Sequence, residues 1–268
     1  MDLDFGGRVI VVTGGASGIG ASCARFFAAR DGRVVVADKN EAAARQVAGD
    51  IDGFAAAVDI AQEAEVEALM ARLEDEVGPI AVLVNSAGVL QRTVPPGELT
   101  MKEWDLVVRI DLRGTYVCCA AAGLRMARRH GGSIVNIASV AGMRSGPLHS
   151  YGPAKAGVIN LTQCLAAEWG PVGVRVNAVS PGFTRTPALD KGMELGTLDR
   201  HDMTTGSALG RLVEPEEIAA AVGFLASDLA SAITGVNIAV DAGYLVATPW
   251  HNYGGLRPSA AAIGETRV

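Results

Sequence analysis

The chain has 268 residues, of which 49% are hydrophobic and 19% are charged, so it holds enough apolar material for one large core. At this length one α/β domain is a better expectation than two small domains. The formal net charge of −6 argues against nucleic acid as a partner, because phosphate binding requires a basic surface.

The termini and the cysteine and histidine side chains exclude further classes. The N-terminal MDLDFGG lacks the basic region of a signal peptide, and no apolar run approaches the roughly 18 residues of a membrane span. These features predict no membrane association, and the histidines show no HxxH or HExxH spacing, so we expect no metal site. There is no CxxC pair, and we expect reduced, packed thiols of a cytoplasmic protein at Cys23, Cys118, Cys119 and Cys164.

Seven short apolar runs follow one another along the chain, at residues 8–13, 33–38, 54–59, 80–85, 133–138, 174–180 and 235–240. The runs are continuously apolar, which is typical of a parallel sheet buried on both faces. Helix-length patterns separate them, and strands that alternate with helices form right-handed βαβ units. The sequence therefore predicts an α/β, single-domain, doubly wound (Rossmann) fold with a seven-stranded parallel sheet over residues 1–247, followed by a C-terminal extension over 248–268.

Two of the helices have clear start signals, and a third helix is expected between them. Thr100 and Glu103 match a capping box, which predicts a long helix from there toward Arg129. A second helix is expected from about residue 151 to residue 169. Pro215 stands between two acids, where a missing N–H costs nothing and the helix dipole favours negative charge.

The glycine-rich stretch TGGASGIG, residues 13–20, directly follows the first strand and opens a helix. Gly14 permits a tight turn, and Gly18 lets the backbone approach a pyrophosphate, which the helix N-terminus attracts. The spacing is G-x-x-x-G-x-G, ending at Gly20, so the turn alone is weak evidence. Its place after the first strand favours a dinucleotide site over an ordinary turn.

Two acids follow the next strands. Asp38 ends the second strand, where a carboxylate can accept hydrogen bonds from both ribose hydroxyls of an adenosine and would repel a 2′-phosphate. This predicts NAD rather than NADP, although Lys39 is adjacent and basic. Asp59, at the end of the third strand, could hold the adenine amino group or could simply cap the strand end.

These features, together with later motifs, resemble the short-chain dehydrogenase/reductase family over about residues 5–245. The motifs are TGGASGIG, Asp59-Ile60, NSAG (85–88), IVNIAS (134–139), YGPAK (151–155), NAVSPGFTRT (177–186) and TGVNIAVDAGY (234–244). The resemblance implies cofactor contacts from Gly14, Ser17, Gly18, Ile19, Gly20, Asp38, Asp59, Ile60, Asn85, Ala87, Gly88, Tyr151, Lys155, Pro181, Gly182, Phe183, Thr184 and Thr186.

In this family the Tyr of YxxxK is the general acid/base, which here is Tyr151. Residues i and i+4 of a helix share one face, so Lys155 can lie beneath Tyr151 and reach the nicotinamide ribose. A free phenol has a pKa near 10, and a nearby ammonium is expected to lower that pKa toward working pH. Ser139 matches the family Ser that orients the substrate oxygen.

The sequence departs from the family pattern at two positions. Asp111 stands in the long fourth helix where the family usually has Asn, which is thought to hold a water that relays protons to the Lys. We expect the relay to survive with an altered pH profile. Ser86 stands in NSAG where Asn is commoner, and the turn beside the cofactor should stay intact.

The substrate pocket is expected after strands four to six. We predict that it is lined by Val89, Leu90, Gln91, Ala141, Met143, Leu148, His149 and the stretch 183–209. Most of these residues are apolar or small, which favours a neutral or weakly polar alcohol or ketone. The irregular stretch 183–212 is predicted to be a lid that closes over the substrate.

Relatives are mostly tetramers, and small residues on the 151–169 helix would permit close packing in a homotetramer. Trp250 and Tyr253 are expected to pack on a neighbouring subunit, with a loose end as the alternative. The resemblance thus predicts an NAD-dependent alcohol dehydrogenase or ketone reductase. The alternatives are an NADPH-dependent carbonyl reductase and a regulator that binds a dinucleotide without turnover.

Overall fold

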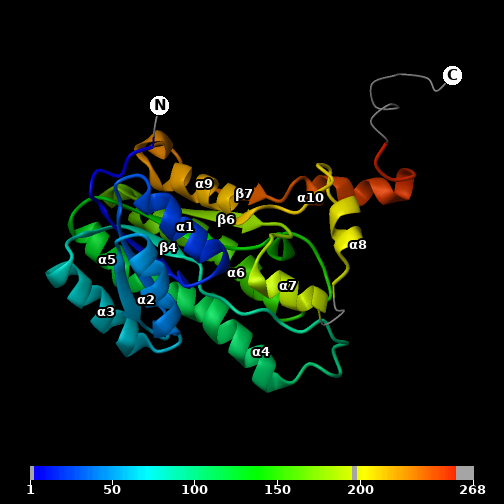
Figure 1. Cartoon of the computed structure of the whole chain (residues 1–268), viewed down its shortest axis with the longest axis horizontal. Coiled ribbons are helices and arrows are strands. Elements are labelled where there is room, and N and C mark those ends of the chain that lie inside the picture. Colours follow the sequence, from blue (N-terminus) through cyan, green and yellow to red (C-terminus); the bar gives the residue numbers. More distant parts are fainter. Residues whose placement is uncertain (1–2, 195–197, 258–268) are drawn as a thin grey trace.

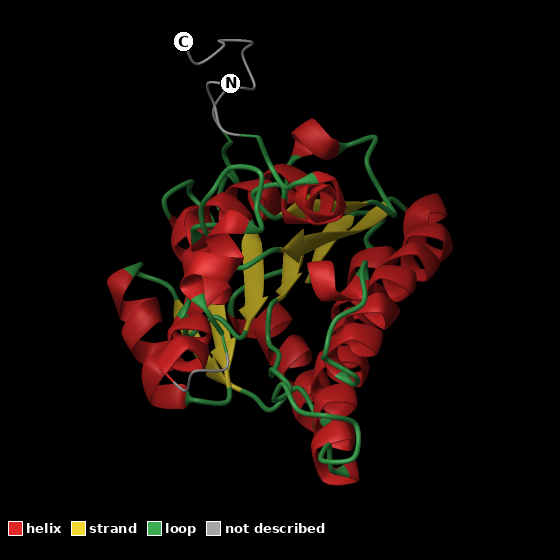
Figure 2. Cartoon of the chain, turned by 90° about the vertical axis from the view of Figure 1, so that its right-hand side faces the viewer, coloured by secondary structure: helices red, strands yellow, loops and turns green. Residues whose placement is uncertain are grey.

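The computed structural model describes residues 3–194 and 198–257. Seven parallel strands form one sheet in the order β3-β2-β1-β4-β5-β6-β7, with helices on both faces (Figures 1 and 2). The strands are β1 (Val9–Thr13), β2 (Arg33–Asp38), β3 (Phe54–Ala57), β4 (Ile80–Asn85), β5 (Gly132–Ile137), β6 (Val174–Pro181) and β7 (Asn237–Val240). The predicted fold class is confirmed.

The helices connect successive strands and cover the sheet. They are α1 (Gly18–Ala28), α2 (Glu41–Asp50), α3 (Glu63–Glu76), α4 (Met101–Val107), the π-helix η1 (Val108–Gly114), α5 (Thr115–Arg128), α6 (Tyr151–Trp169), α7 (Pro187–Glu194), α8 (Arg200–Thr205), α9 (Pro215–Ala226) and α10 (Tyr244–Ala247). Short 3₁₀ turns are η2 (Val140–Gly142), η3 (Gly170–Val172), η4 (Asp228–Ala230) and η5 (Thr248–Tyr253).

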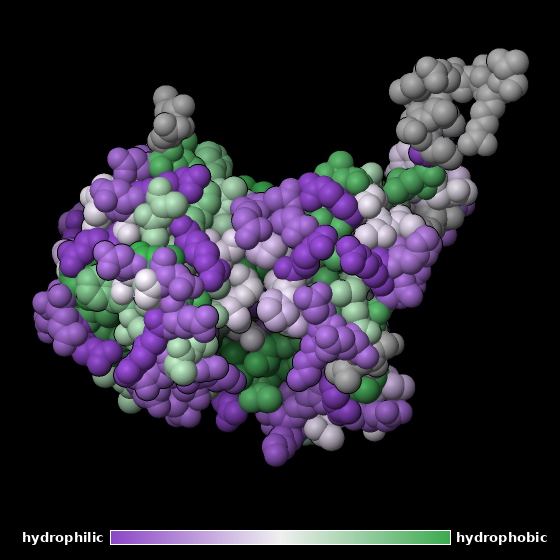
Figure 3. All heavy atoms as spheres, viewed as in Figure 1, coloured by the Kyte–Doolittle hydropathy of each residue, from purple (hydrophilic) through white to green (hydrophobic). Residues whose placement is uncertain are grey.

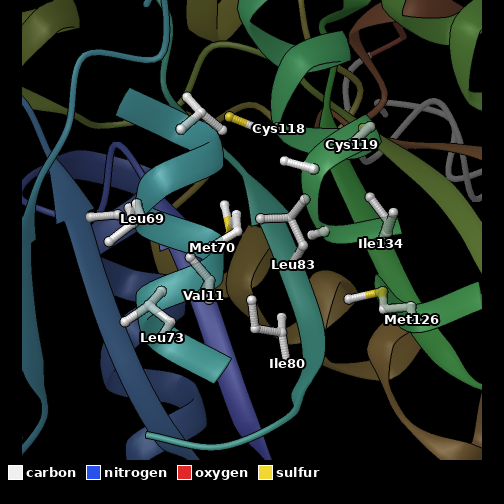
Figure 4. Packing of buried hydrophobic residues seen from close by; sticks show 14 of the residues in the cluster. Val11, Leu69, Met70, Leu73, Ile80, Leu83, Cys118, Cys119, Met126 and Ile134 are labelled. Carbon is white, nitrogen blue, oxygen red and sulfur yellow. The ribbon is translucent and has the colours of Figure 1, made fainter. Parts of the chain in front are cut away.

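Each face of the sheet has its own hydrophobic core. One core joins the strands to α3 and α5, with Val11, Leu69, Leu83 and Met126 among its buried residues (Figure 4). The other joins the strands to α1, α2 and α9. This double burial explains why the strand sequences are continuously apolar. The exceptions are the two edge strands, since β3 is mostly exposed and β7 is only partly buried.

The long helix predicted after Thr100 is interrupted. The helical run continues from Met101 to Arg128, but its middle turn, η1, is a π-helix. The predicted capping box is half formed: the Thr100 hydroxyl accepts from the Glu103 N–H at 3.2 Å, but the Glu103 carboxylate bonds Arg92. The complete capping box of this fold lies instead at the start of α9.

The region 183–212, expected to be irregular, contains the helices α7 and α8. Leu189, Met203 and Leu212 form a small core of their own, against which Phe183 packs. The Phe183 ring also meets the Tyr244 ring edge-to-face at 5.2 Å. These contacts give the region a separate packing unit beside the sheet, at the right of Figure 1. In the view of Figure 3, hydrophobic atoms gather in a hollow between the α2 side and the α7 side of the molecule.

The chain continues beyond α10 as an arm that leaves the body of the molecule (Figure 1). On this arm Trp250 is 44% exposed and Tyr253 is 87% exposed. Residues 258–268 of the predicted extension lie outside the described residues. In the described part of the chain, no helix combines the length and apolar character needed to cross a membrane.

The prediction of four packed thiols was wrong for one cysteine. Cys23, Cys118 and Cys119 are buried and free, but Cys164 is exposed on α6. The adjacent Leu165 is buried, but the Cys164 position of α6 is exposed.

Candidate active site

The candidate site lies at the carboxyl ends of the strands, where the sheet order reverses between β1 and β4. Parallel strands bring their carboxyl ends to one edge, and a reversal leaves a crevice there for a ligand. The glycine turn follows β1, the NSAG turn follows β4, Ser139 follows β5, and Pro181 ends β6. The fold therefore brings together motifs that are up to 170 residues apart in the sequence, roughly the span from Thr13 to Thr186.

The glycine turn fits a pyrophosphate because side chains are excluded from it. Gly14 has a φ of +64°, and a Cβ there would come within 2.6 Å of the Ala87 backbone. A Cβ on Gly20 would overlap the Gly14 carbonyl oxygen. Ser17, the N-cap of α1, makes no side-chain capping bond, so the first N–H groups of the helix are not covered by their own cap. These donors at a helix N-terminus fit an anionic ligand.

Asp38 lies beside this turn. One of its carboxylate oxygens accepts from the Ala16 N–H at 3.3 Å and the other from the Asn40 N–H at 2.9 Å. Asn40, not Asp38, is the side-chain cap of α2. The half-buried acid therefore stands at the edge of the glycine turn, where the sequence predicted a contact to the adenosine ribose.

Asp59 and Ile60 lie just beyond β3, which ends at Ala57, two residues earlier than predicted. The Asp59 carboxylate caps the following turn by accepting from the Ala61 N–H at 2.9 Å. Ile60 is buried and packs against Gly114. The contact is so close that a Cβ on Gly114 would lie 2.8 Å from the Ile60 side chain. The capping role of Asp59 is thus visible, and its contact with adenine stays a prediction.

Asn85 belongs to a buried network of polar side chains. Its amide donates to the Asn136 side chain at 2.9 Å, and Asn136 donates to the Thr162 hydroxyl at 2.9 Å. The network ties β4 and β5 to α6. The NSAG turn that follows lies against the glycine turn through Ala87.

Tyr151, Lys155, Ser139 and Asp111 converge beside this turn. The Lys155 ammonium lies 5.6 Å from the centre of the Tyr151 ring and 3.4 Å from Asp111 Oδ2, and it donates to the Ile137 carbonyl at 3.0 Å. Ser139 is close enough to the Tyr151 phenol to favour its ionised form, and its hydroxyl oxygen accepts from the Ala141 N–H at 3.1 Å. The structure thus brings together the four residues that the sequence singled out for catalysis.

The π-helix η1 carries Asp111 into this cluster. Asp111 is fully buried, and its Oδ1 accepts from the Val89 N–H at 2.9 Å. A Cβ on Gly88 would come within 3.1 Å of Asp111 Oδ2 and 3.5 Å of Lys155 Nζ. Gly88 therefore leaves room for the ion pair at the end of the NSAG turn.

Burial is the largest single influence on the pKa of each of the three titratable residues, Tyr151, Asp111 and Lys155. Burial raises the pKa of Tyr151, Lys155 acts to lower it, and Asp111 raises it again, so the net direction is upward. Burial also raises the pKa of Asp111 despite the attraction of Lys155. Burial lowers the pKa of Lys155, but Asp111 and Tyr151 together raise it above its ordinary value. The expectation of a lowered Tyr151 pKa does not hold for the chain by itself, because burial raises the pKa more than the ammonium lowers it, and Asp111 adds to the rise.

The segment after β6 brings the last predicted residues to the same edge. Gly182 lies against the Asp241 backbone, where a Cβ would be 2.7 Å away. The Thr184 hydroxyl donates to the Gly182 carbonyl at 3.0 Å, and the Thr186 methyl group lies 3.4 Å from the place a Cβ on Gly18 would take. Thr186 also accepts from the Leu189 N–H at the start of α7.

The predicted pocket residues differ in exposure. Leu90 and Met143 are exposed, at 55% and 44%, and His149 is half-buried. Gln91 is buried at 5% exposure and hydrogen-bonded to Ser150 and Tyr151, which the sequence did not reveal. A second hollow, at the opposite edge of the sheet, is lined by Arg8, Arg129 and Arg175. Those guanidiniums bind carboxylates and backbone carbonyls, so they hold the fold together there.

Fold and site together define a doubly wound α/β protein of the dinucleotide-binding kind. Comparisons with known proteins lead to the same class of protein. The family model described as enoyl-(acyl carrier protein) reductase matches residues 14–245. The chain is 42% identical over 262 residues to D-threitol dehydrogenase of Mycolicibacterium smegmatis, covering 92% of this chain and 96% of that protein.

Two further matches extend the comparison. Cis-4-hydroxycyclohexanecarboxylate dehydrogenase of Sinomonas cyclohexanicum is 42% identical over 245 residues, covering 90% of this chain and 97% of that protein. A crystal structure described as ribose-5-phosphate isomerase from Brucella melitensis 16M is 58% identical, with a TM-score of 0.95, covering 96% of this chain and 99% of that one. The chain belongs to the short-chain dehydrogenase/reductase family and is an oxidoreductase that uses a nicotinamide cofactor.

Proposed function

We propose that this protein is an NAD-dependent dehydrogenase of secondary alcohols and the corresponding ketones, with Tyr151 as the general acid/base. The observation that carries the proposal is the convergence of Tyr151, Ser139, Lys155 and Asp111 beside a glycine turn built for a pyrophosphate. A regulator without turnover would need the glycine turn but has no use for the buried titratable cluster.

Each residue of the catalytic cluster has its own role in the reaction. The glycine turn would hold the cofactor, which when bound would supply the hydride chemistry. Ser139 orients the substrate oxygen by a hydrogen bond, and Tyr151 takes the hydroxyl proton during oxidation or returns it during reduction. Lys155 stabilises the phenolate, and Asp111, facing the ammonium at 3.4 Å, holds that charge in place and can accept the proton in turn.

Preference for NAD is supported by Asp38. Its carboxylate is fixed at the glycine turn by the Ala16 and Asn40 N–H groups, so it cannot easily swing away from a ribose 2′-phosphate. The rival, an NADPH-dependent reductase, would have to rely on the exposed Lys39 for the phosphate. The fixed acid favours NAD.

The substrate class is supported by the two dehydrogenases of known substrate and by the cations of the site. D-threitol and cis-4-hydroxycyclohexanecarboxylate are both secondary alcohols with further oxygens. Arg185, a cation near the predicted pocket, is paired with Glu214 at 3.1 Å, which leaves it poorly placed to hold a phosphate. We therefore do not propose the isomerisation of a sugar phosphate, which would also move hydrogen within one molecule without a dinucleotide.

Several wider predictions belong to the same proposal. Residues 1–247 act as one cofactor-binding and catalytic domain, α7 and α8 close over the substrate, and the arm with Trp250 and Tyr253 packs on a neighbouring subunit of a homotetramer. The three buried free thiols support a reducing, cytoplasmic setting.

The test is turnover by the purified protein with NAD⁺ or NADP⁺, followed at the nicotinamide absorbance. D-threitol and cis-4-hydroxycyclohexanecarboxylate are the first substrates, and ribose 5-phosphate is expected to remain unchanged. Tyr151→Phe should lower kcat by roughly 100- to 10,000-fold while cofactor binding persists. Tyr116→Phe, at an exposed phenol on α5, is the matched control. Equal activity in the Tyr151 variant and the control would refute the proposed role.

A further inference from the structure

Gln91 is a buried amide in an otherwise exposed loop. It lies in the segment after β4, between Leu90, which is 55% exposed, and the exposed Arg92, but it is itself only 5% exposed. A Gln side chain is rarely buried without a structural or binding reason, because its amide must leave water.

The segment that carries Gln91 is fixed on both sides. The Val89 N–H donates to Asp111 at 2.9 Å, and the Arg92 N–H donates to Glu103 at 2.9 Å. The Arg92 guanidinium also binds Glu103, at 2.8 Å. The backbone around Gln91 is thus held against α4 and η1, which keeps the Gln91 side chain in a defined place.

The carbonyl oxygen of Gln91 caps the helix that carries Tyr151. Oε1 accepts from the Ser150 N–H at 2.7 Å, from the Ser150 hydroxyl at 2.9 Å and from the Tyr151 N–H at 3.3 Å. Ser150 is the N-cap of α6 but makes no side-chain capping bond of its own. The Gln91 side chain therefore caps the N-terminus of α6, a role that a local Ser or Asp side chain has in many other helices.

The remaining donors of this first turn are accounted for without Gln91. The Gly152 N–H donates to the Leu148 carbonyl at 2.9 Å, and the Ala154 N–H donates to the Ser150 carbonyl at 3.0 Å. Pro153 has no N–H to satisfy. The start of α6 therefore uses the Gln91 amide through Oε1, as an acceptor.

The amide nitrogen of Gln91 has no hydrogen-bond partner among the described residues, although it is buried. The orientation of the amide is fixed by its partners, because exchanging oxygen and nitrogen would place the NH₂ group against two backbone N–H donors. A buried donor without an acceptor is costly. Nε2 is bonded to the same carbon as Oε1, so this unsatisfied donor lies at the first residue of the catalytic helix.

We propose that Gln91 Nε2 donates a hydrogen bond to a second oxygen of the alcohol substrate, while Oε1 holds the start of the Tyr151 helix. The inference rests on the proposed function. It makes Gln91 the residue by which the enzyme selects alcohols that carry a further hydroxyl, carbonyl or carboxylate oxygen near the reacting carbon. A monofunctional alcohol of the same carbon skeleton leaves the donor unpaired and binds more weakly.

The test compares butane-2,3-diol with butan-2-ol, which differ by one oxygen. The wild-type enzyme should favour the diol in kcat/KM by about 10-fold or more. Gln91→Glu keeps an acceptor for the Ser150 and Tyr151 N–H groups but removes the donor. It should lower the diol-to-monoalcohol ratio of kcat/KM by about 10- to 100-fold, chiefly through KM.

Gln91→Met removes both functions and should in addition lower kcat for both alcohols, because the helix start loses its cap. Gln46→Glu, at an exposed position of α2, controls for the added negative charge. A wild-type enzyme that oxidises both alcohols equally well, or a Gln91→Glu enzyme with an unchanged ratio, would overturn the inference and leave the proposed function standing. No oxidation of any secondary alcohol by the wild type would instead defeat the proposed function.

A crystal structure of the wild-type enzyme with NAD and a diol gives a readout that does not depend on the variants folding. The inference requires Nε2 within hydrogen-bond distance of the diol's second oxygen. A complex in which the diol turns that oxygen away from Gln91 would overturn it.

Discussion

Replacing Asp111 by Asn should move the pH dependence of alcohol oxidation to lower pH. Asp111 raises the pKa of Tyr151, and oxidation requires the phenolate as the base. Asn has the same size and keeps an oxygen for the Val89 N–H, but it carries no charge. Removing the charge lowers the Tyr151 pKa, so the base forms at lower pH.

The size of the shift follows from the geometry. Lys155 Nζ lies 3.4 Å from Asp111 Oδ2 and 5.6 Å from the Tyr151 ring centre, so the carboxylate and the ring are no more than about 9 Å apart. At that distance and an effective dielectric constant of about 20, two unit charges interact by about 1.8 kcal/mol, or about 1.3 pH units. Because the Lys155 ammonium also loses its partner and its own pKa falls, we expect a net downward shift of about one unit.

The assay is kcat/KM for alcohol oxidation from about pH 6 to about pH 11 with saturating NAD⁺, since a free phenol titrates near 10. The midpoint of the curve does not depend on the fraction of active enzyme, so a loss of stability on breaking the buried pair does not disturb it. Asp228→Asn, which removes an exposed acid paired with Arg8, is the control and should leave the midpoint in place. An unchanged or upward-shifted midpoint in Asp111→Asn would show that the carboxylate does not act on Tyr151.

Three further predictions concern the cofactor, the glycine turn and the arm. Asp38→Ala should lower the NAD-to-NADP ratio of kcat/KM by about 10-fold or more, because the repulsion of a 2′-phosphate disappears. The ratio is measured with both cofactors, and a constant ratio would contradict the role of Asp38. Gly14→Ala should cost about 2 kcal/mol or more of unfolding free energy in urea titrations, because its φ of +64° and the Ala87 backbone leave no place for a methyl group. Gly49→Ala, in α2 with open space around it, should instead stabilise the protein by about 0.5–1 kcal/mol, and the same sign for both variants would refute this reasoning. Truncation after Ala247 should weaken subunit assembly in sedimentation experiments, and unchanged assembly and KM would mean that the arm has no such role.

The parts of the fold that depend on local pattern were predictable. The seven apolar runs became the seven strands, and the inner strands are largely apolar because both of their faces are buried. The helix predicted over 151–169 has those bounds in the structure. The spacing of Tyr151 and Lys155 needed only the geometry of one helical turn.

The parts of the fold and of the site that depend on distant contacts could not be predicted from the sequence. The π-turn at η1 shifts the register by one residue within a run that reads as ordinary helix, so hydrophobic periodicity does not reveal it. Gln91 caps a helix 60 residues further along the chain, and no local motif marks a cap of that kind. The upward pKa of Tyr151 arises from burial and from Asp111, neither of which the YxxxK spacing encodes. The helices α7 and α8 are short and lie in a Gly- and Thr-rich stretch whose small core forms only in three dimensions.

The replacement of Asn by Asp changes the resting state of the site. With Asn, Lys155 would present one uncompensated positive charge to the phenol, which favours the phenolate. Burial raises the pKa of Tyr151, Lys155 lowers it, and Asp111 at 3.4 Å from the ammonium offsets part of the effect of Lys155. A protonated phenol is ready to donate to a ketone, whereas oxidation must first remove the proton. We therefore expect the rate of oxidation to rise with pH toward the raised pKa of Tyr151, with Asp111 contributing to the position of that midpoint, while the equilibrium between alcohol and ketone depends on the concentrations of proton, cofactor and substrate.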